Sequence, residues 1–138
     1  MEKYLIIESN WKSLNKLEAF LDDFFEELNL DRISFYNILL SLTESVGNSI
    51  SHGNNYDEEK SVIITASWED NKLGLMVEDE GIGFDVNKLK DPTLPENIHN
   101  ESGRGLYLIR KLADEVNLLE NGRVIEIKFK TNREHQVL

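Results

Sequence analysis

Two polar side chains lie four residues apart in the segment TESVGNSISHGN, residues 43–54. In a helix, Glu44 and Asn48 lie one turn apart on the same face, turned away from an apolar stripe. Oxygen ligands of these types suit Mg²⁺, which keeps several waters and takes one or two protein groups. A carboxylate one turn away can orient or deprotonate a hydroxyl group or a water molecule. An ordinary solvated helix face has the same spacing, so the pair alone leaves both interpretations open.

The segment VEDEGIGFD, residues 77–85, is a second candidate. Asp79 ends an expected strand and shares the parity of three apolar residues, so its carboxylate should lie at the rim of an apolar layer. There it can accept a hydrogen bond from an adenine amino group while the ring packs on aliphatic side chains. Gly81 and Gly83 permit a sharp turn and a close approach to a ligand. A strand that simply ends in a glycine turn is the competing interpretation, because the third glycine of a dinucleotide fingerprint is missing.

A third candidate is the segment ESGRGLYLIRKL, residues 101–112. Gly103 and Gly105 are expected where a long loop enters an amphipathic helix. The free amides and the dipole of such a helix start bind anions, and Arg104 can add a charge-assisted contact to a phosphate. A glycine-rich loop that caps a helix beside an exposed arginine is the alternative.

Hydrophobic periodicity and turn signals predict the elements that carry these residues. The expected order is a strand, two helices, two strands, a long loop, a third helix and two strands. Helices grouped between adjacent hairpins predict an α+β two-layer sandwich, with a mostly antiparallel sheet covered on one face. The strands are expected at 3–8, 62–69, 73–79, 118–120 and 124–130, and the helices at 14–28, 31–53 and 105–116.

Local signals place the ends of several elements. Asp31 is expected to cap the second helix and Gly53 to terminate it. Residues 80–102 are polar and hold both prolines, so they are expected to form a long loop,. The tail from Thr131 is expected to fray. Tight turns are expected at two asparagine-containing pairs, 70–71 and 121–122,.

Composition limits the classes of function. The 138 residues fit one domain, and a net charge of -11 argues against a nucleic-acid partner, which requires a basic face,. ATP is compatible, because amides, a helix start and Mg²⁺ can hold phosphates, and the acidic surface suits a partner protein with a basic patch. There is no cysteine, which excludes disulfides and thiolate metal sites,. Neither a signal peptide nor a membrane span is expected, so the expected location is the cytoplasm.

In order along the chain, the three segments form a pattern that is more specific than any one of them. Glu-x-x-x-Asn on a helix, Asp-x-Gly-x-Gly after a strand and Gly-x-Gly opening a helix resemble the GHKL ATP-binding superfamily. The chain resembles its small branch, the anti-sigma-factor serine/threonine kinases, and ESVGNSISHGN and GRGLYLIRKLADEV carry most of the resemblance. The resemblance implies one Bergerat-type, histidine-kinase-like ATP-binding domain over residues 1–138, with a nucleotide lid at about 84–102.

The resemblance also implies a role for each candidate residue. Asn48 would ligate Mg²⁺, and Glu44 would act as general base toward a serine hydroxyl of a partner or toward water. Asp79 would bind the adenine amino group, above a floor shaped by Gly81 and Gly83. The phosphates would be wrapped by Gly103, Arg104 and Gly105.

Three details qualify this resemblance. Arg123 and Val124 stand where relatives often place a threonine near the adenine. The lid is not rich in arginine, so the phosphate charge must be met mainly by Mg²⁺, amides and Arg104. His52 aligns with a histidine common in this branch, and helix-end capping or packing is expected for it.

The implied function is transfer of the γ-phosphoryl group of ATP to a small anti-anti-sigma-type protein by a serine/threonine kinase. One alternative is a non-catalytic module that sequesters a partner such as a sigma factor, and another is a slow stand-alone ATPase. The chain has neither a G-x-x-x-x-G-K-[ST] loop nor a eukaryotic-type kinase signature, and three histidines without cysteine do not favour a zinc site,. A homodimer is compatible with this branch, although no sequence feature demands one.

Overall fold

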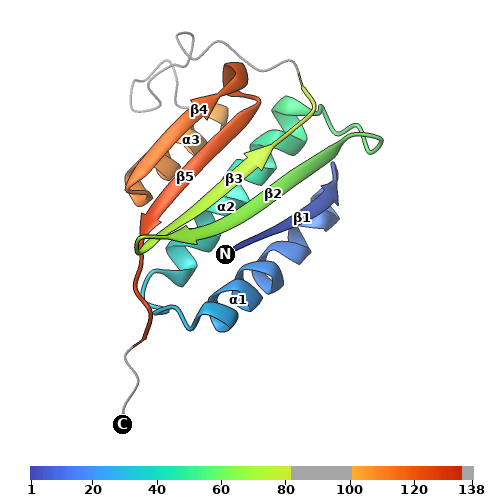
Figure 1. Ribbon diagram of the computed structural model, residues 1–138. Helices are drawn as coiled ribbons and strands as arrows, with labels where there is room; N and C mark the ends of the chain where they lie inside the picture. The colour runs from blue at the N-terminus through green and yellow to red at the C-terminus, as the bar shows by residue number, and fades with distance from the viewer. Residues whose placement is uncertain (82–100, 135–138) are drawn as a thin grey trace.

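The structure is a computed structural model that describes residues 1–81 and 101–134. The strands are β1 (Glu2–Glu8), β2 (Ser61–Glu69), β3 (Lys72–Glu78), β4 (Glu115–Leu119) and β5 (Val124–Lys130), and the helices are α1 (Leu17–Leu28), α2 (Phe35–Asn48) and α3 (Glu101–Leu112). The strands form one antiparallel sheet in the order β1-β2-β3-β5-β4. All three helices cover the same face of the sheet (Figure 1). The expected α+β architecture and the expected order of helices and strands are therefore confirmed.

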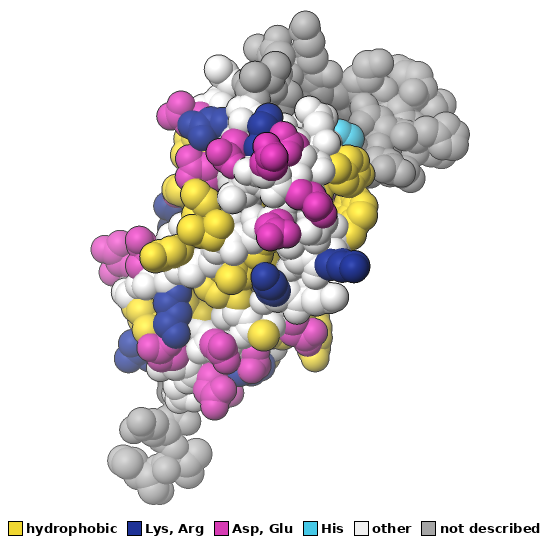
Figure 2. All heavy atoms as spheres, turned by 90° about the vertical axis from the view of Figure 1, so that its right-hand side faces the viewer, with side chains coloured by type: hydrophobic (Ala, Val, Ile, Leu, Met, Phe, Trp, Pro, Cys, Tyr) yellow, Lys and Arg dark blue, Asp and Glu magenta, His cyan; other side chains and the backbone are white. Residues whose placement is uncertain are grey.

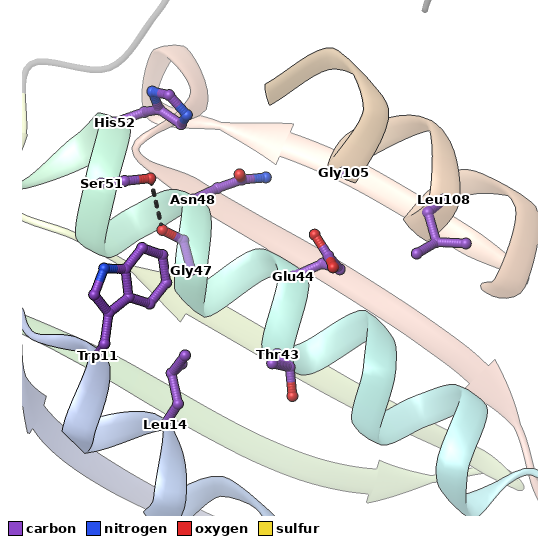
Figure 3. Close-up of a pocket in the computed structure, with 10 residues that line it drawn as sticks. All are labelled: Trp11, Leu14, Thr43, Glu44, Gly47, Asn48, Ser51, His52, Gly105 and Leu108. Carbon is purple, nitrogen blue, oxygen red and sulfur yellow. Dashed lines mark hydrogen bonds between the residues drawn. The ribbon is translucent and has the colours of Figure 1, made fainter. Parts of the chain in front are cut away.

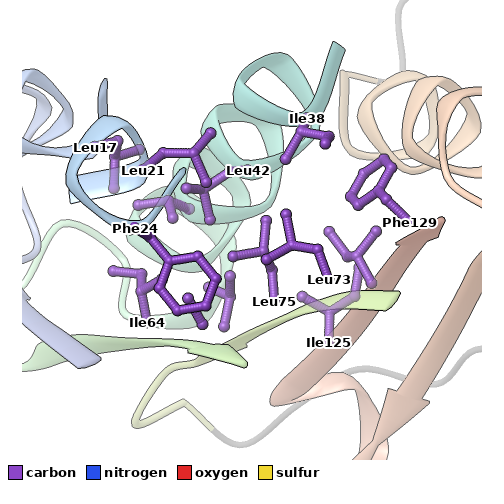
Figure 4. Packing of buried hydrophobic residues seen from close by; sticks show 14 of the residues in the cluster. Leu17, Leu21, Phe24, Ile38, Leu42, Ile64, Leu73, Leu75, Ile125 and Phe129 are labelled. Carbon is purple, nitrogen blue, oxygen red and sulfur yellow. The ribbon is translucent and has the colours of Figure 1, made fainter. Parts of the chain in front are cut away.

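An apolar core lies between the sheet and the helices (Figure 4). On β3, alternate side chains are fully buried: Leu73, Leu75 and Val77. The buried stripe of α2 consists of Phe35, Ile38, Leu42 and Val46, and Ile50 continues it just beyond the end of the helix. Burial of each such apolar side chain contributes about 1.5–3 kcal/mol, so the stripe fixes the rotation of α2. Glu44 and Asn48 consequently face away from the core.

The ends of α2 differ from the predicted ones. Asp31 does not cap the helix, because its Oδ1 accepts a hydrogen bond from the Ile33 amide (2.8 Å) in the preceding turn. The helix begins at Phe35, and Ser34 is its N-cap residue. After Asn48 the chain continues as a π-helical turn, η2 (Ser49–Gly53).

Gly53 does not end the helix in a left-handed conformation. The left-handed residues lie just beyond it, at Asn55 (φ 51) and Tyr56 (φ 58). The requirement for glycine at position 53 therefore comes from packing, not from the φ angle.

The predicted third helix is displaced toward the N-terminus. It begins at Glu101 and ends at Leu112, whereas the prediction ran from 105 to 116. Val116 instead pairs with Ile127 between β4 and β5. The apolar spacing that resembles a helix continues across this boundary, and sheet pairing overrides it. Gly103 and Gly105 consequently lie within the helix and not in a loop ahead of it.

The predicted turn before β3 is confirmed, with Asp70 and Asn71 at φ 53 and 61. The turn before β5 involves one residue more than predicted, because Glu120, Asn121 and Gly122 all have positive φ. The tail does not fray up to residue 134: the Glu134 amide donates to the Asn29 carbonyl (2.8 Å), and Leu30 forms a β-bridge with Arg133. Most of the predicted loop and lid, residues 82–100, lies outside the described residues.

Charged side chains of both signs are interspersed on the face that Figure 2 shows. Lysine and arginine side chains are scattered over this face and do not form one continuous patch (Figure 2). Across residues 1–81 and 101–134, the helices are too short or too polar to cross a bilayer.

Candidate functional site

A cleft of about 390 Å³ lies along the outer face of α2. One wall comes from α3, and the other comes from η1 (Trp11–Lys16), the 3₁₀ segment that precedes α1 (Figure 3). The half-buried side chains of Glu44 and Asn48 lie between these walls. The remaining lining residues are Trp11, Leu14, Thr43, Gly47, Ser51, His52, Gly105 and Leu108.

Gly105 brings α3 into contact with both candidate side chains of α2. A β-carbon placed on Gly105 would lie 3.1 Å from Asn48 Nδ2 and 3.2 Å from Glu44 Oε2. Any larger residue would have to displace these side chains. The structure thus brings together Glu44, Asn48 and Gly105, three of the residues selected from the sequence.

Asp79 follows the last residue of β3 and is 5% exposed. Burial raises the pKa of its carboxyl group above the ordinary value of 3.8, because the charged form loses hydration. The Gly81 amide, which donates to Asp79 Oδ1 (2.8 Å), counteracts this rise in pKa. The Ser49 hydroxyl and the charge of Arg123 act in the same direction, whereas Glu78 adds to the rise. The site therefore holds a desolvated carboxylate with few polar partners.

Two glycines surround this carboxylate. A β-carbon on Gly53 would lie 2.3 Å from Asp79 Oδ2, and a β-carbon on Gly81 would lie 2.3 Å from the Gly53 carbonyl oxygen. Neither position has space for a side chain. The predicted approach of Gly81 to a ligand stays a prediction, and within the described residues Gly81 lies close to Gly53.

The two groups of residues are linked by η2. Asn48 ends α2, and Gly53, the last residue of η2, contacts Asp79. Asp79 does not belong to the lining of the cleft over α2, as judged from the described residues. The structure therefore places Glu44, Asn48 and Gly105 in one cleft, and Asp79 beside η2, near both its first residue, Ser49, and its last residue, Gly53.

Arg123, the residue just before β5, supports the end of β3. Its Nη1 donates to Glu78 Oε1 (3.1 Å) and to the Asp79 carbonyl (3.4 Å). In return, the Asp79 amide donates to the Arg123 carbonyl (3.1 Å). Arg123 therefore holds the end of the strand that precedes the buried carboxylate.

The remaining residues selected from the sequence lie outside the described residues, in the first turn of α3 or at the end of η2. Gly83 lies outside the described residues, and so does the lid apart from Glu101 and Ser102. Gly103 and Arg104 belong to the first turn of α3. His52 is exposed and lines the cleft at the end of η2.

Sequence reasoning missed three residues around Asp79: Gly53, Ser49 and Arg123. Ser49 directly follows Asn48 and lies on the opposite, buried side. Its position relative to the apolar helical stripe could have indicated this burial. The contact of Gly53 with Asp79 joins two segments distant in sequence, and no local pattern indicates it.

Residues 7–129 match the family described as the histidine kinase-like ATPase domain. The chain is similar to the serine-protein kinase RsbW of Bacillus cereus, with 30% identity over 104 residues that cover 71% of this chain and 64% of that protein. The serine-protein kinase RsbW of Bacillus thuringiensis shows the same identity and coverage. The chain thus spans less than two thirds of the length of these curated relatives.

A solved structure supports the fold. The crystal structure of the RsbU and RsbW domains of Rv1364c from Mycobacterium tuberculosis superimposes with a TM-score of 0.65 and 16% identity, covering 96% of this chain and 32% of that chain. The resemblance to anti-sigma-factor serine kinases inferred from the motifs is confirmed by these similarities. Since the family match spans most of its length, the chain belongs to the histidine kinase-like ATPase domain family.

Proposed function

We propose that this protein binds Mg-ATP and transfers the γ-phosphoryl group to a serine or threonine of a small regulatory protein of the anti-anti-sigma type. The observation that carries this proposal is the convergence of Glu44, Asn48 and Gly105 in one cleft. Glu44 offers a potential base and Asn48 a potential metal ligand, and Gly105, in the second turn of α3, lets this helix approach both side chains. The similarity to proteins named serine-protein kinases supports the same reaction class.

The nucleotide would extend along η2. Its adenine amino group would donate to the Asp79 carboxylate, and its phosphates would approach the first turn of α3, where backbone amides and the helix dipole favour anions. Gly103 and Arg104 belong to that turn, and Gly105 follows it directly. The distribution of the two groups along η2 suits an elongated ligand with a purine at one end and phosphates at the other.

The donor set also fits a magnesium ion. Asn48 offers an amide oxygen, and the nearby Gly105 leaves its side chain free of a bulky neighbour. An amide oxygen with waters and phosphate oxygens is a common Mg²⁺ environment in ATP-binding sites. When bound, the ion would neutralise phosphate charge during transfer.

Glu44 would receive the proton of the acceptor hydroxyl. The hydroxyl oxygen forms a bond to the γ-phosphorus while the bond from that phosphorus to the β,γ-bridging oxygen breaks, and ADP leaves. The proton passes to the Glu44 carboxylate, which lies half-buried in the cleft one turn from Asn48. The remainder of the catalytic effect would come from positioning and charge stabilisation.

Incubation with ATP labelled at the γ-phosphate and with candidate partner proteins tests this proposal. Label on a serine or threonine of the partner supports the kinase. A stable ATP-dependent complex without label would instead indicate sequestration of the partner, for example a sigma factor. Phosphate release without any partner would indicate a stand-alone ATPase, provided that Asn48→Ala abolishes it and so excludes a contaminant. Such a kinase would act in the cytoplasm, where ATP is available.

A further inference from the structure

Asn54 is a buried polar residue to which the proposed chemistry assigns no role. It directly follows Gly53, the last residue of η2, and none of its surface is exposed. A buried amide side chain is costly unless its hydrogen bonds are made. The partners of Asn54 therefore indicate what this side chain holds in place.

The Asn54 side chain connects three segments that are distant in sequence. Its Nδ2 donates to the hydroxyl of Ser9 (2.8 Å), just after β1, and to the carbonyl of Ser61 (2.9 Å), at the start of β2. Its Oδ1 accepts a hydrogen bond from the amide of Glu80 (2.8 Å), just after β3. Both amide hydrogens and the oxygen are engaged, so the side chain has one orientation in which every partner is satisfied.

The bond to Glu80 matters most for the site, because Glu80 lies between Asp79 and Gly81. Each backbone amide of this stretch has a partner: the Arg123 carbonyl for Asp79 (3.1 Å), Asn54 for Glu80, and the Asp79 carboxylate for Gly81. Of these three bonds, only the one to Asn54 reaches the segment that follows α2. It ties the end of β3 to the helix that carries Glu44 and Asn48.

We infer that Asn54 is a positioning residue for purine recognition. By holding Glu80 against the end of η2, it sets where the Asp79 carboxylate lies relative to Asn48. The inference rests on the proposed function, in which Asp79 accepts a hydrogen bond from the adenine amino group. The tight packing of Gly53 on Asp79 makes this position sensitive to small shifts, since no void separates the two segments,.

A measurable consequence is the choice between adenine and guanine. A carboxylate accepts a hydrogen bond from the amino group of adenine, whereas guanine presents a carbonyl oxygen at that position, which the carboxylate repels. Discrimination of this kind depends on a polar group held in place. Loss of the hydrogen bond between Asn54 and the Glu80 amide should therefore lower the preference for ATP over GTP. A loss of stability alone should leave this preference unchanged.

The test compares ATP and GTP binding, by calorimetry with Mg²⁺, for the wild type, Asn54→Ala and Ser9→Ala. Ser9→Ala is the matched control: the Ser9 hydroxyl accepts from Asn54 and donates to the Lys60 carbonyl (2.6 Å), but it does not contact Glu80. We expect Asn54→Ala to weaken ATP binding about tenfold, the scale of one positioned hydrogen bond. GTP binding should change much less, so the ATP:GTP preference falls. Ser9→Ala should keep the preference even if its Tm is lower.

Hydrogen exchange of the Glu80 amide provides a second readout, and it should become faster in Asn54→Ala but not in Ser9→Ala. If Asn54→Ala does not fold, the same measurements are made on Asn54→Ser, which keeps a polar group at this buried position. An ATP:GTP preference that is unchanged in a folded Asn54 variant overturns the inference while leaving the proposed function intact. A wild type that binds no ATP would overturn both.

Discussion

Gly53 and Asp79 are in direct contact: a β-carbon on Gly53 would lie 2.3 Å from Asp79 Oδ2. The end of the π-helical turn and the end of β3 therefore touch without space for any side chain. Because η2 continues directly from α2, this contact transmits the position of the helix to the buried carboxylate. The backbone therefore sets the distance between Asp79 and the cleft residues of α2, Glu44 and Asn48.

Gly53→Ala should therefore damage nucleotide binding. The added methyl group must push away the Asp79 carboxylate, and overpacking of this kind costs about 1–3 kcal/mol. We expect lower stability in thermal unfolding and at least about tenfold weaker ATP binding by calorimetry.

Gly47→Ala is the matched control for Gly53→Ala. Gly47 lies in α2, which η2 continues, and a β-carbon on Gly47 would meet Trp11 at 3.5 Å, an ordinary contact distance. Replacement of a helical glycine by alanine stabilises the helix by up to about 1 kcal/mol. Equal losses of ATP affinity in the two variants would refute the special role of the Gly53 contact.

The sequence was sufficient for those features that depend on local periodicity. Alternation along β3, together with the turn at Asp70 and Asn71, correctly predicted that Asp79 lies on the buried face of the sheet. The apolar stripe of α2 likewise predicted that Glu44 and Asn48 share an outward face. Both predictions needed only the side-chain period of one element.

The predictions that failed concern features that depend on contacts between elements. The start of α3 was predicted too late because Gly103 and Gly105 disfavour a helix by propensity. In the folded chain, Gly105 is buried against α2, and a larger side chain would collide with Asn48. The position of Gly53 was misinterpreted for the same reason, since its packing partner Asp79 is remote in the sequence.

Gly105→Ala should impair phosphoryl transfer more than it impairs the fold. Its β-carbon would lie 3.1 Å from Asn48 Nδ2 and 3.2 Å from Glu44 Oε2, so both side chains must shift by a few tenths of an ångström. The better helix propensity of alanine offsets part of the packing cost. We expect a Tm close to that of the wild type and a kcat for partner phosphorylation that is lower by about 10- to 100-fold. An unchanged kcat would show that the cleft tolerates this shift.

Asp79→Asn should weaken ATP binding by about 1–3 kcal/mol, because the amide presents a donor where an acceptor is needed. Calorimetry with ATP for the two proteins measures this difference directly. Equal affinities would remove Asp79 from the adenine site.

The same variant has a pH-dependent effect on stability. Because burial raises the pKa of Asp79 above 3.8, the folded state holds this proton more tightly than the unfolded chain does,. The stabilisation from protonated Asp79 is complete below about pH 3.8 and is lost as the pH rises through the raised pKa. Without ATP, Asp79→Asn should therefore have an unfolding free energy at pH 7 at least equal to that of the wild type. The difference in unfolding free energy between Asp79→Asn and the wild type, measured by urea titration, should shrink as the pH is lowered. A difference that grows in favour of Asp79→Asn at lower pH would contradict this account.

Glu44→Gln should abolish phosphoryl transfer while leaving ATP binding nearly intact. The substitution keeps the size of the side chain beside Gly105 but removes the basic oxygen that would take the hydroxyl proton. General-base catalysis contributes about 10²–10⁴-fold, so single-turnover transfer to the partner should slow by that factor while the Kd for ATP changes less than about threefold. Glu69→Gln, an exposed carboxylate at the end of β2, removes the same charge away from the cleft and should leave both quantities unchanged. A Glu44→Gln protein that phosphorylates its partner at the wild-type rate would show that this carboxylate is not the base.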